Sequence, residues 1–211
     1  MKELIIIGTG GFARECYYLA CHARGFANEF TVKGFLEGDL PASEELYRKL
    51  PLAVVGNVAD YPIKDSDVFV CAIANPQHRK KFCSAMEDKG AKFINLISNK
   101  TVIAQETAMG VGNIISFYTL ISCNVSIGNH VIVNTSSGIG HDSKLGDYTT
   151  LSAYCDITGN VSVGAMTMWG SGSRVLPGSI IEDGAFIGAG SVVLKRVKKG
   201  KTVFGIPAVE I

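Results

Sequence analysis

The sequence predicts a small N-terminal α/β domain with a parallel sheet, followed by a C-terminal parallel β-helix. Over residues 1–95, short apolar runs alternate with segments of helical spacing, which is typical of Rossmann-like α/β units. From about residue 97 the helical spacing disappears, while Gly, Ser, Thr and Asn become frequent. An apolar residue then recurs at every sixth position, which indicates a solenoid. We therefore expect one domain over residues 1–95 and a second over residues 96–211.

The first half is expected to contain four strands and three helices, and residues that favour helix ends mark where the helices start and stop. Buried parallel strands are expected where the apolar runs lie, at residues 3–8, 32–37, 67–74 and 91–97. Helices are expected between them, at residues 11–25, 43–50 and 76–90. Ser43 is a suitable N-cap, and Pro76 suits the first turn of a helix. Gly25 and Gly90 are suitable helix stops.

The second half contains two sets of positions that follow the same six-residue period. The first set is apolar throughout: Ile97, Ile103, Met109, Ile115, Ile121, Ile127, Val133, Ile139, Leu145, Leu151, Ile157, Val163, Trp169, Val175, Ile181, Ile187 and Val193. The second set lies two residues earlier and is small or β-branched: Val125, Val131, Ser137, Ser143, Thr149, Cys155, Val161, Thr167, Ser173, Ser179, Ala185 and Ser191. Because side chains alternate along a strand, both sets face the interior. Each hexapeptide is one side of a coil, and three sides place equivalent positions 18 residues apart.

The composition indicates a globular protein without a strongly charged partner. The 211 residues are 47% hydrophobic and 18% charged, with a formal net charge of +1. This excludes a disordered chain. It also gives no general attraction to nucleic acid or to an anionic membrane, so we expect neither as a partner.

We expect neither a membrane span nor a secretion signal. No run reaches the roughly 18 apolar residues that cross a bilayer. The N-terminal apolar run is too short for a signal peptide and lacks a small-residue cleavage pattern. The six cysteines form no C-x-x-C pair, which is typical of reduced and mostly buried thiols. The expected location is therefore the cytoplasm.

The stretch GTGGFA, residues 8–13, follows an expected strand and opens an expected helix. Glycines at such a turn let a phosphate approach the backbone and the helix N-terminus. The pattern also fits G-x-G-x-x-A, with Glu37 or Asp39 following, so a nicotinamide-dependent enzyme is an alternative. The shortness of this half and the lack of a separate hydride-transfer domain count against it. A tight turn that binds nothing is the remaining alternative.

His141 and Asp142 are the candidate chemical groups of the repeat. His141 lies two residues after the inward Ile139, which places it at a coil corner where it can face a groove. Its imidazole titrates near neutrality, so it can act as a general base. A carboxylate on its second nitrogen would fix the tautomer, and Asp142 can converge with it at a corner. A solvated surface histidine is the alternative interpretation.

The residues stacked one coil away leave room for this pair. The positions 18 residues from His141 are Cys123 and Gly159, both small. Those next to Asp142 are Asn124 and Asn160, which could form hydrogen bonds with it.

No metal site is expected. A zinc site of the carbonic anhydrase type on a β-helix needs three clustered histidines, and only His130 and His141 lie in the repeat. His22 and His78 fall on expected helices. These two and His130 are interpreted as structural or surface residues.

The repeat resembles that of the hexapeptide acyltransferases, whose coils form a left-handed parallel β-helix. The whole chain is similar to their sugar O- and N-acyltransferase subgroup, which includes bacterial sialic-acid O-acetyltransferases and UDP-4-amino-sugar N-acetyltransferases. The matching stretches are IIIGTGGFARE (5–15), VKGFLEGD (32–39), VVGN (54–57), VIVNTSSGIGHDSKLGDYTTLS (131–152), VSVGAMTMWGSGSRVLPGSIIEDGAFIGAGSVV (161–193) and VFGIPA (203–208).

The resemblance implies a role for several residues. It makes His141 the catalytic base and places Asp142 where close relatives carry glutamate. For the acceptor sugar nucleotide it implies contacts from Gly10, Gly11, Phe12, Glu37, Gly56 and Asn134. For the acyl donor it points to Thr150, Gly159, Gly170, Ser171 and Asp183. The basic run at residues 194–201 is either a solvated loop or a partner for coenzyme A phosphates.

The resemblance also implies the activity. We expect an acetyl-CoA-dependent N-acetyltransferase that acts on a nucleotide-linked amino sugar, with a UDP-4-amino sugar as the implied acceptor. Transfer is direct, without a covalent enzyme intermediate, and the implied assembly is a homotrimer. The alternatives are an O-acetyltransferase for sialic acid or another sugar, and a non-catalytic nucleotide-sugar-binding or scaffolding protein.

Overall fold

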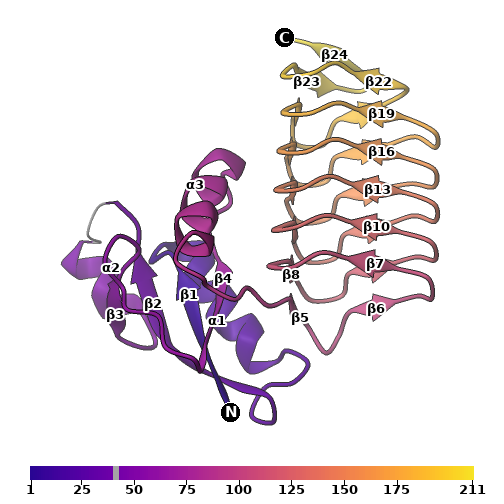
Figure 1. Ribbon diagram of the computed structural model, residues 1–211. Coiled ribbons are helices and arrows are strands. Elements are labelled where there is room, and N and C mark those ends of the chain that lie inside the picture. Colours follow the sequence, from indigo (N-terminus) through magenta and orange to yellow (C-terminus); the bar gives the residue numbers. More distant parts are fainter. Residues whose placement is uncertain (40–42) are drawn as a thin grey trace. The chain divides into compact units, whose positions relative to one another are not determined.

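The computed structural model describes residues 1–39 and 43–211. The chain forms two compact units, Met1–Asn99 and Lys100–Ile211 (Figure 1). Across the residues that are described, no helix combines the length and the apolar character needed to cross a membrane.

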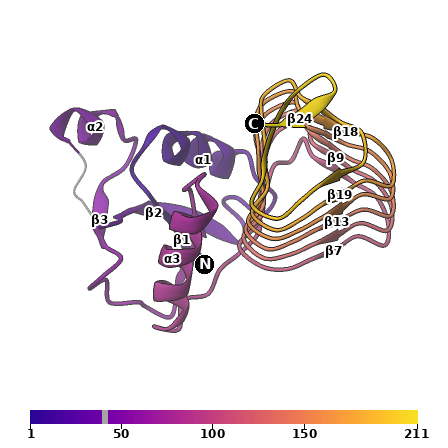
Figure 2. The same ribbon diagram turned by 90° about the horizontal axis from the view of Figure 1, so that it is seen from above.

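The first unit is a parallel sheet covered by helices. Its elements are β1 (Lys2–Ile7), α1 (Gly11–Cys21), β2 (Phe30–Glu37), α2 (Glu44–Lys49), β3 (Val54–Asn57), β4 (Asp67–Cys71), α3 (Pro76–Glu87) and β5 (Leu96–Ile97). The sheet has the order β3-β2-β1-β4, and all its neighbouring strands are parallel. Helices α1 and α3 lie on opposite faces of this sheet (Figure 2). The strand order reverses at β1, and in such sheets ligands bind beyond the carboxyl ends of the strands.

The predicted starts of two helices are confirmed. The Ser43 hydroxyl accepts a hydrogen bond from the Leu46 N–H at 3.3 Å and caps α2. Pro76 occupies the first turn of α3, where its missing N–H costs nothing. The Asn75 side chain caps this helix by accepting from the His78 N–H at 3.0 Å.

Two sequence predictions for this unit need correction, and one strand was missed. The first helix ends at Cys21 rather than near Gly25, because Ala23 leaves the helix to form an antiparallel bridge with Ser98. The strand expected over 91–97 is reduced to Leu96–Ile97. Strand β3 was not predicted, because this short strand is only half-buried and contains Gly56.

The second unit is a parallel β-helix with three sheets. The first sheet contains β7 (Ala108–Met109), β10 (Ser126–Ile127), β13 (Lys144–Leu145), β16 (Ser162–Val163), β19 (Ile180–Ile181) and β22 (Arg196–Val197). The second contains β6 (Val102–Ile103), β9 (Leu120–Ile121), β12 (Gly138–Ile139), β15 (Asp156–Ile157), β18 (Arg174–Val175) and β21 (Val192–Val193). The third contains β8 (Ile114–Ile115), β11 (Ile132–Val133), β14 (Thr150–Leu151), β17 (Met168–Trp169), β20 (Phe186–Ile187), β23 (Thr202–Gly205) and the antiparallel β24 (Ala208–Glu210).

The predicted repeat register is confirmed. Each two-residue strand from β6 to β21 ends on one of the predicted apolar positions, and parallel partners such as Ser126 and Lys144 lie 18 residues apart. The small residues also face inward and bond to the neighbouring coil. The Ser143 hydroxyl donates to the Thr158 carbonyl at 2.9 Å and accepts from the Val161 N–H at 3.1 Å. The inward Ser143 hydroxyl is therefore paired with the next coil both as a donor and as an acceptor.

Adjacent residues on β13 should differ sharply in their effect on stability. Leu145 is 3% exposed, whereas Lys144 points outward. Leu145→Ala is expected to lower the free energy of unfolding by about 2–5 kcal/mol, because it leaves a cavity in the coil. Lys144→Ala should change it by less than about 0.5 kcal/mol. Denaturant unfolding followed by the fluorescence of Trp169, the single tryptophan, measures both values. Equal effects of the two substitutions would contradict the observed register.

Candidate active site

His141 and Asp142 form a hydrogen-bonded pair at the corner between β12 and β13. The imidazole Nδ1 lies 2.6 Å from Asp142 Oδ2. Asp142 has a left-handed backbone with φ 60°, a conformation that aspartate tolerates. This turn brings two consecutive side chains to the same side, whereas in a strand they would point apart. An aspartate in this position therefore reaches the histidine next to it.

A second partner holds the other carboxylate oxygen. Asn124, one coil earlier, donates from Nδ2 to Asp142 Oδ1 at 2.6 Å. The hydrogen bonds from His141, and then from Asn124, lower the pKa of the Asp142 carboxyl group. A carboxyl pKa lowered by folding stabilises the native state above the ordinary aspartate pKa. That contribution disappears as the pH falls through the lowered value.

Gly159 provides the space that the imidazole occupies. A Cβ atom at Gly159 would lie 2.6 Å from His141 Nε2 and 2.7 Å from Cε1. The side chains of His141 and Asp142 are 56% and 43% exposed. With Nδ1 bonded to a carboxylate, the tautomer with a free lone pair on Nε2 is favoured. The pair can therefore accept a proton from a group that approaches the corner from solvent.

The first unit contains a cavity of about 570 Å³ at the carboxyl edge of its sheet. Its walls combine acidic, amide, basic and aromatic side chains, contributed by the ends of β2 and β3 and by α3. The lining residues are Glu37, Gly38, Asp39, Asn57, Val58, Ala59, Lys81, Phe82 and Ala85. Tyr47 donates a hydrogen bond to Glu37 Oε1, and Lys81 pairs with Asp39. Such a concave site with a few fixed polar groups is suited to a small polar ligand.

The glycine turn places a helix N-terminus at the same edge of the sheet. Gly8 follows β1 in a left-handed conformation, φ +115°, and Gly10 is the N-cap of α1. Among residues 1–39 and 43–211, no side chain caps this helix, and a Cβ at Gly10 would meet none of their atoms within 4 Å. The N–H groups of Gly11 and Phe12 belong to the first turn, which attracts anions. Gly56 lies on β3, next to Asn57 of the cavity.

The other predicted residues of the β-helix lie away from the His141 corner. Asn134 follows β11, and its Oδ1 accepts from the Thr135 N–H at 2.7 Å. Gly170 and Ser171 follow β17 at the same type of corner as Asn134. Thr150 lies on β14, paired with Ile132 and Met168.

Asp183 lies at the third type of corner, after β19. Its Oδ1 accepts a hydrogen bond from the Ala165 N–H at 2.8 Å, so this carboxylate binds the backbone of the preceding coil. Within one chain, the structure thus brings His141, Asp142 and Gly159 together and leaves the other candidates on separate corners and faces.

Both halves of the chain match protein-family models. The model for the bacterial transferase hexapeptide matches residues 160–195, and the model for the PglD N-terminal domain matches residues 3–86. The first unit is therefore similar to the PglD N-terminal domain, and part of the β-helix is similar to the bacterial hexapeptide transferases. GDP-perosamine N-acetyltransferase of Escherichia coli O157:H7 is 35% identical over 137 residues, which cover 65% of this chain and 54% of that protein. The chain spans little more than half the length of the curated relatives that it matches.

Solved structures share the fold of this chain over its whole length. The acetyltransferase domain of PglB from Neisseria gonorrhoeae FA1090 has a TM-score of 0.87 and 23% identity, with 100% of both chains covered. A histidine-to-asparagine variant of perosamine N-acetyltransferase from Caulobacter crescentus, solved with CoA and GDP-perosamine, has a TM-score of 0.88 and 26% identity. It covers 100% of this chain and 97% of that one.

Sequence reasoning missed part of the cavity in the first unit. Glu37 was anticipated, and Asp39 was considered beside it, but Asn57, Lys81 and Phe82 were not. The order β3-β2-β1-β4, which places the end of β3 beside that of β2, could have indicated Asn57. Lys81 and Phe82 come from α3, whose packing the sequence does not show.

Gly159→Ala should displace the imidazole without unfolding the coil. The added methyl group would collide with an exposed side chain end, which can move, so we expect the free energy of unfolding to change by less than about 1 kcal/mol. The Nδ1 bond to Asp142 should be lost, which the imidazole ¹⁵N chemical shifts report. Gly138→Ala is the matched control, because its nearest neighbour, Asp156 Oδ1, is 3.8 Å away. An unchanged His141 spectrum in Gly159→Ala would contradict this geometry.

Proposed function

We propose that this chain transfers an acetyl group from acetyl-CoA to the amino group of a nucleotide-linked sugar. The observation that carries the proposal is the His141–Asp142 pair, hydrogen-bonded at 2.6 Å on a solvent-facing corner of a β-helix. The N-acetyltransferase names of the E. coli and Caulobacter relatives support it. The Caulobacter relative was solved as a histidine variant with CoA and an amino-sugar nucleotide, which agrees with a role for a histidine in such enzymes.

The chemistry needs a base for the sugar amine. As the amine nitrogen attacks the thioester carbonyl, it must lose a proton, and His141 Nε2 is the group placed to take it. Asp142 then stabilises the imidazolium through the Nδ1 bond. When the carbon–sulfur bond breaks, the imidazolium returns the proton to the departing thiolate. The products are the amide and the free thiol of CoA, and the base is regenerated without a covalent enzyme intermediate.

The acceptor nucleotide is proposed to bind to the first unit. The uncapped N-terminus of α1 suits the diphosphate, because its N–H groups and helix dipole favour negative charge. Glu37 and Asn57 in the adjoining cavity offer hydrogen-bond partners to ribose or base. The family resemblance favours UDP, whereas the E. coli relative is named for a GDP sugar. The proposal therefore specifies a nucleoside diphosphate amino sugar and leaves the base to the assay.

A homotrimer is proposed as the working assembly. Asn134, Gly170 and Ser171 share one type of corner, while His141 lies at another. In a trimer, two β-helices lie side by side, and a neighbouring chain can place its Asn134, Gly170 and Ser171 beside His141. Light scattering should then give a mass three times the 22.5 kDa of one chain.

His141→Ala should abolish most of the activity. With acetyl-CoA and a panel of UDP- and GDP-amino sugars, release of the CoA thiol is expected from at least one sugar nucleotide. Loss of the general base should lower kcat/KM by about 10²–10⁴-fold, with the fold retained. Turnover of free sialic acid alone would instead support an O-acetyltransferase. The absence of thiol release with every acceptor would favour a binding or scaffolding protein and contradict the proposal.

Glu37→Gln should weaken acceptor binding and leave the chemical step intact. Because a hydrogen bond to a charged group is lost, KM for the nucleotide sugar should rise about 10-fold, with little change in kcat. Glu44→Gln is the control, since this neighbouring glutamate on α2 is 90% exposed in its side chain. An unchanged KM in Glu37→Gln would argue against the cavity as the nucleotide site.

A further inference from the structure

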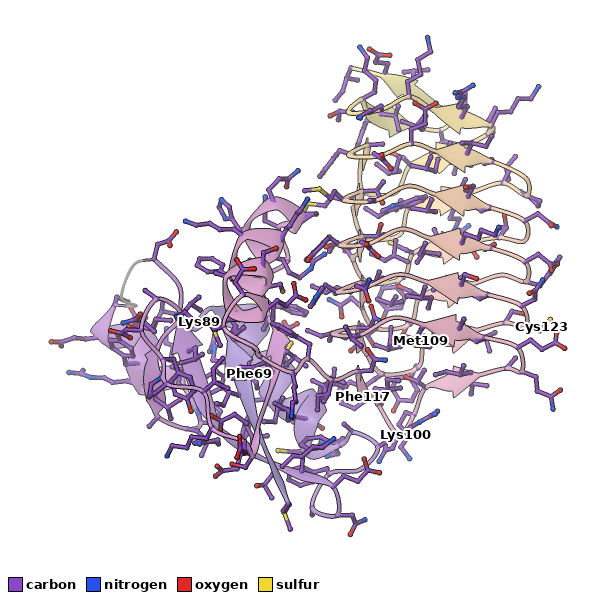
Figure 3. All side chains as sticks on the ribbon, viewed as in Figure 1. Phe69, Lys89, Lys100, Met109, Phe117 and Cys123 are labelled. Carbon is purple, nitrogen blue, oxygen red and sulfur yellow. The ribbon has the colours of Figure 1, made fainter. Side chains whose placement is uncertain are left out.

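The hydrogen bonds of Asp142 use both of its carboxylate oxygens. Oδ2 lies 2.6 Å from His141 Nδ1, and Oδ1 accepts from Asn124 Nδ2, also at 2.6 Å. Within residues 1–39 and 43–211, these are the side-chain bonds that reach the carboxylate. The three residues form a continuous chain, Asn124–Asp142–His141, that spans two coils. Figure 3 labels Cys123, the residue before Asn124, at this corner of the β-helix.

The backbone fixes the position of each member of this chain. Asn124 and Asp142 occupy equivalent left-handed corners 18 residues apart, with φ 54° and φ 60°. The Asp142 N–H donates to the Cys123 carbonyl at 3.2 Å, and the Asn124 N–H donates to the Gln105 carbonyl at 3.3 Å. The two side chains therefore start from backbone sites held in register by the coil stacking. This leaves only side-chain torsions to set the carboxylate orientation.

At an exposed corner, the side-chain torsions of Asp142 need a second restraint besides the hydrogen bond to His141. The Asp142 side chain is 43% exposed, so its carboxylate can rotate into water if a single hydrogen bond holds it. A bond to each oxygen fixes both the rotation and the plane of the group. At metal sites, the outer-shell groups that orient a histidine or carboxylate ligand in this way contribute about 10–100-fold, and we expect an effect of the same order here.

We propose that Asn124 is a positioning residue: by holding Asp142 Oδ1 it keeps the carboxylate on His141 Nδ1 and so orients the base. The inference rests on the proposed function for its kinetic effect, but the bond itself can be measured without turnover. The site then comprises three hydrogen-bonded residues, Asn124, Asp142 and His141.

A glycine substitution tests this role without straining the backbone. Glycine adopts left-handed corners freely, and Gly178 already occupies the equivalent corner further along the β-helix at φ +73°. Asn124→Gly therefore removes the side chain alone. Asn160→Gly is the matched control, because Asn160 has φ 57° at the corresponding corner of the next coil. We expect Asn124→Gly to lower kcat about 10-fold with KM changed less than about twofold, and Asn160→Gly to match the wild type in both.

A double-mutant cycle separates positioning from a general structural effect. If Asn124 acts through Asp142, then Asn124→Gly should have no further effect on kcat in an Asp142→Gly background. The same fold-loss in both backgrounds would overturn the proposal, as would an unchanged kcat in Asn124→Gly alone.

The Asp142 carboxyl pKa, followed by ¹³C NMR, provides a test that does not need turnover. It should rise in Asn124→Gly and stay constant in Asn160→Gly, because the Asn124 bond favours the ionised form. If no acceptor is turned over while this pKa rises, the proposed function fails and the Asn124 contact stands. An unchanged pKa in Asn124→Gly overturns the positioning role whatever the activity.

Discussion

The stacking of coils at an 18-residue register is the constraint on which the second unit depends. Each strand from β6 to β22 is only two residues long, so its few backbone bonds, such as Lys144 N–H to the Val161 carbonyl at 2.9 Å, would hold little alone. They persist because the interior is filled by aliphatic side chains and by small polar ones that bond from coil to coil. A slip by one residue would turn Leu145 outward and Lys144 inward, at a large cost in free energy.

The same register produces the candidate chemistry. His141 and Asp142 meet because the corner adopts a left-handed backbone, and Asn124 reaches Asp142 because it occupies that corner one coil earlier. Gly159, one coil later, leaves the imidazole its space. The orientation of the proposed base is therefore a property of three stacked coils rather than of one short motif. The left-handed corner also lets an aspartate, one methylene shorter than the glutamate of the resembled family, reach the imidazole.

The first unit reaches its proposed role by a different physical route. In a parallel sheet all carboxyl ends lie at one edge, so a glycine turn after β1 and polar residues after β2 and β3 gather there. The open N-terminus of α1 adds an electrostatic preference for an anion. Under the proposed function, the first unit recognises the sugar nucleotide while the second supplies the base.

Most of the β-helix and the order of most elements in the first unit could be predicted from the sequence. The six-residue period placed nearly every strand of the β-helix, the inward side chains and the corner position of His141, because such a repeat has one arrangement that buries its apolar residues. In the first unit the order of most elements and two helix starts could be predicted, since Ser43 and Pro76 act locally. The end of α1 and the strand β3 could not, because a bridge from Ala23 to Ser98 and pairing with β2 decided them. The repeat placed Asn124 and Asn160 next to Asp142, but the side-chain torsions that give the bond to Asn124 are fixed only in the tertiary structure. The cavity likewise needed the tertiary structure, because the packing of α3 depends on neighbours distant in sequence.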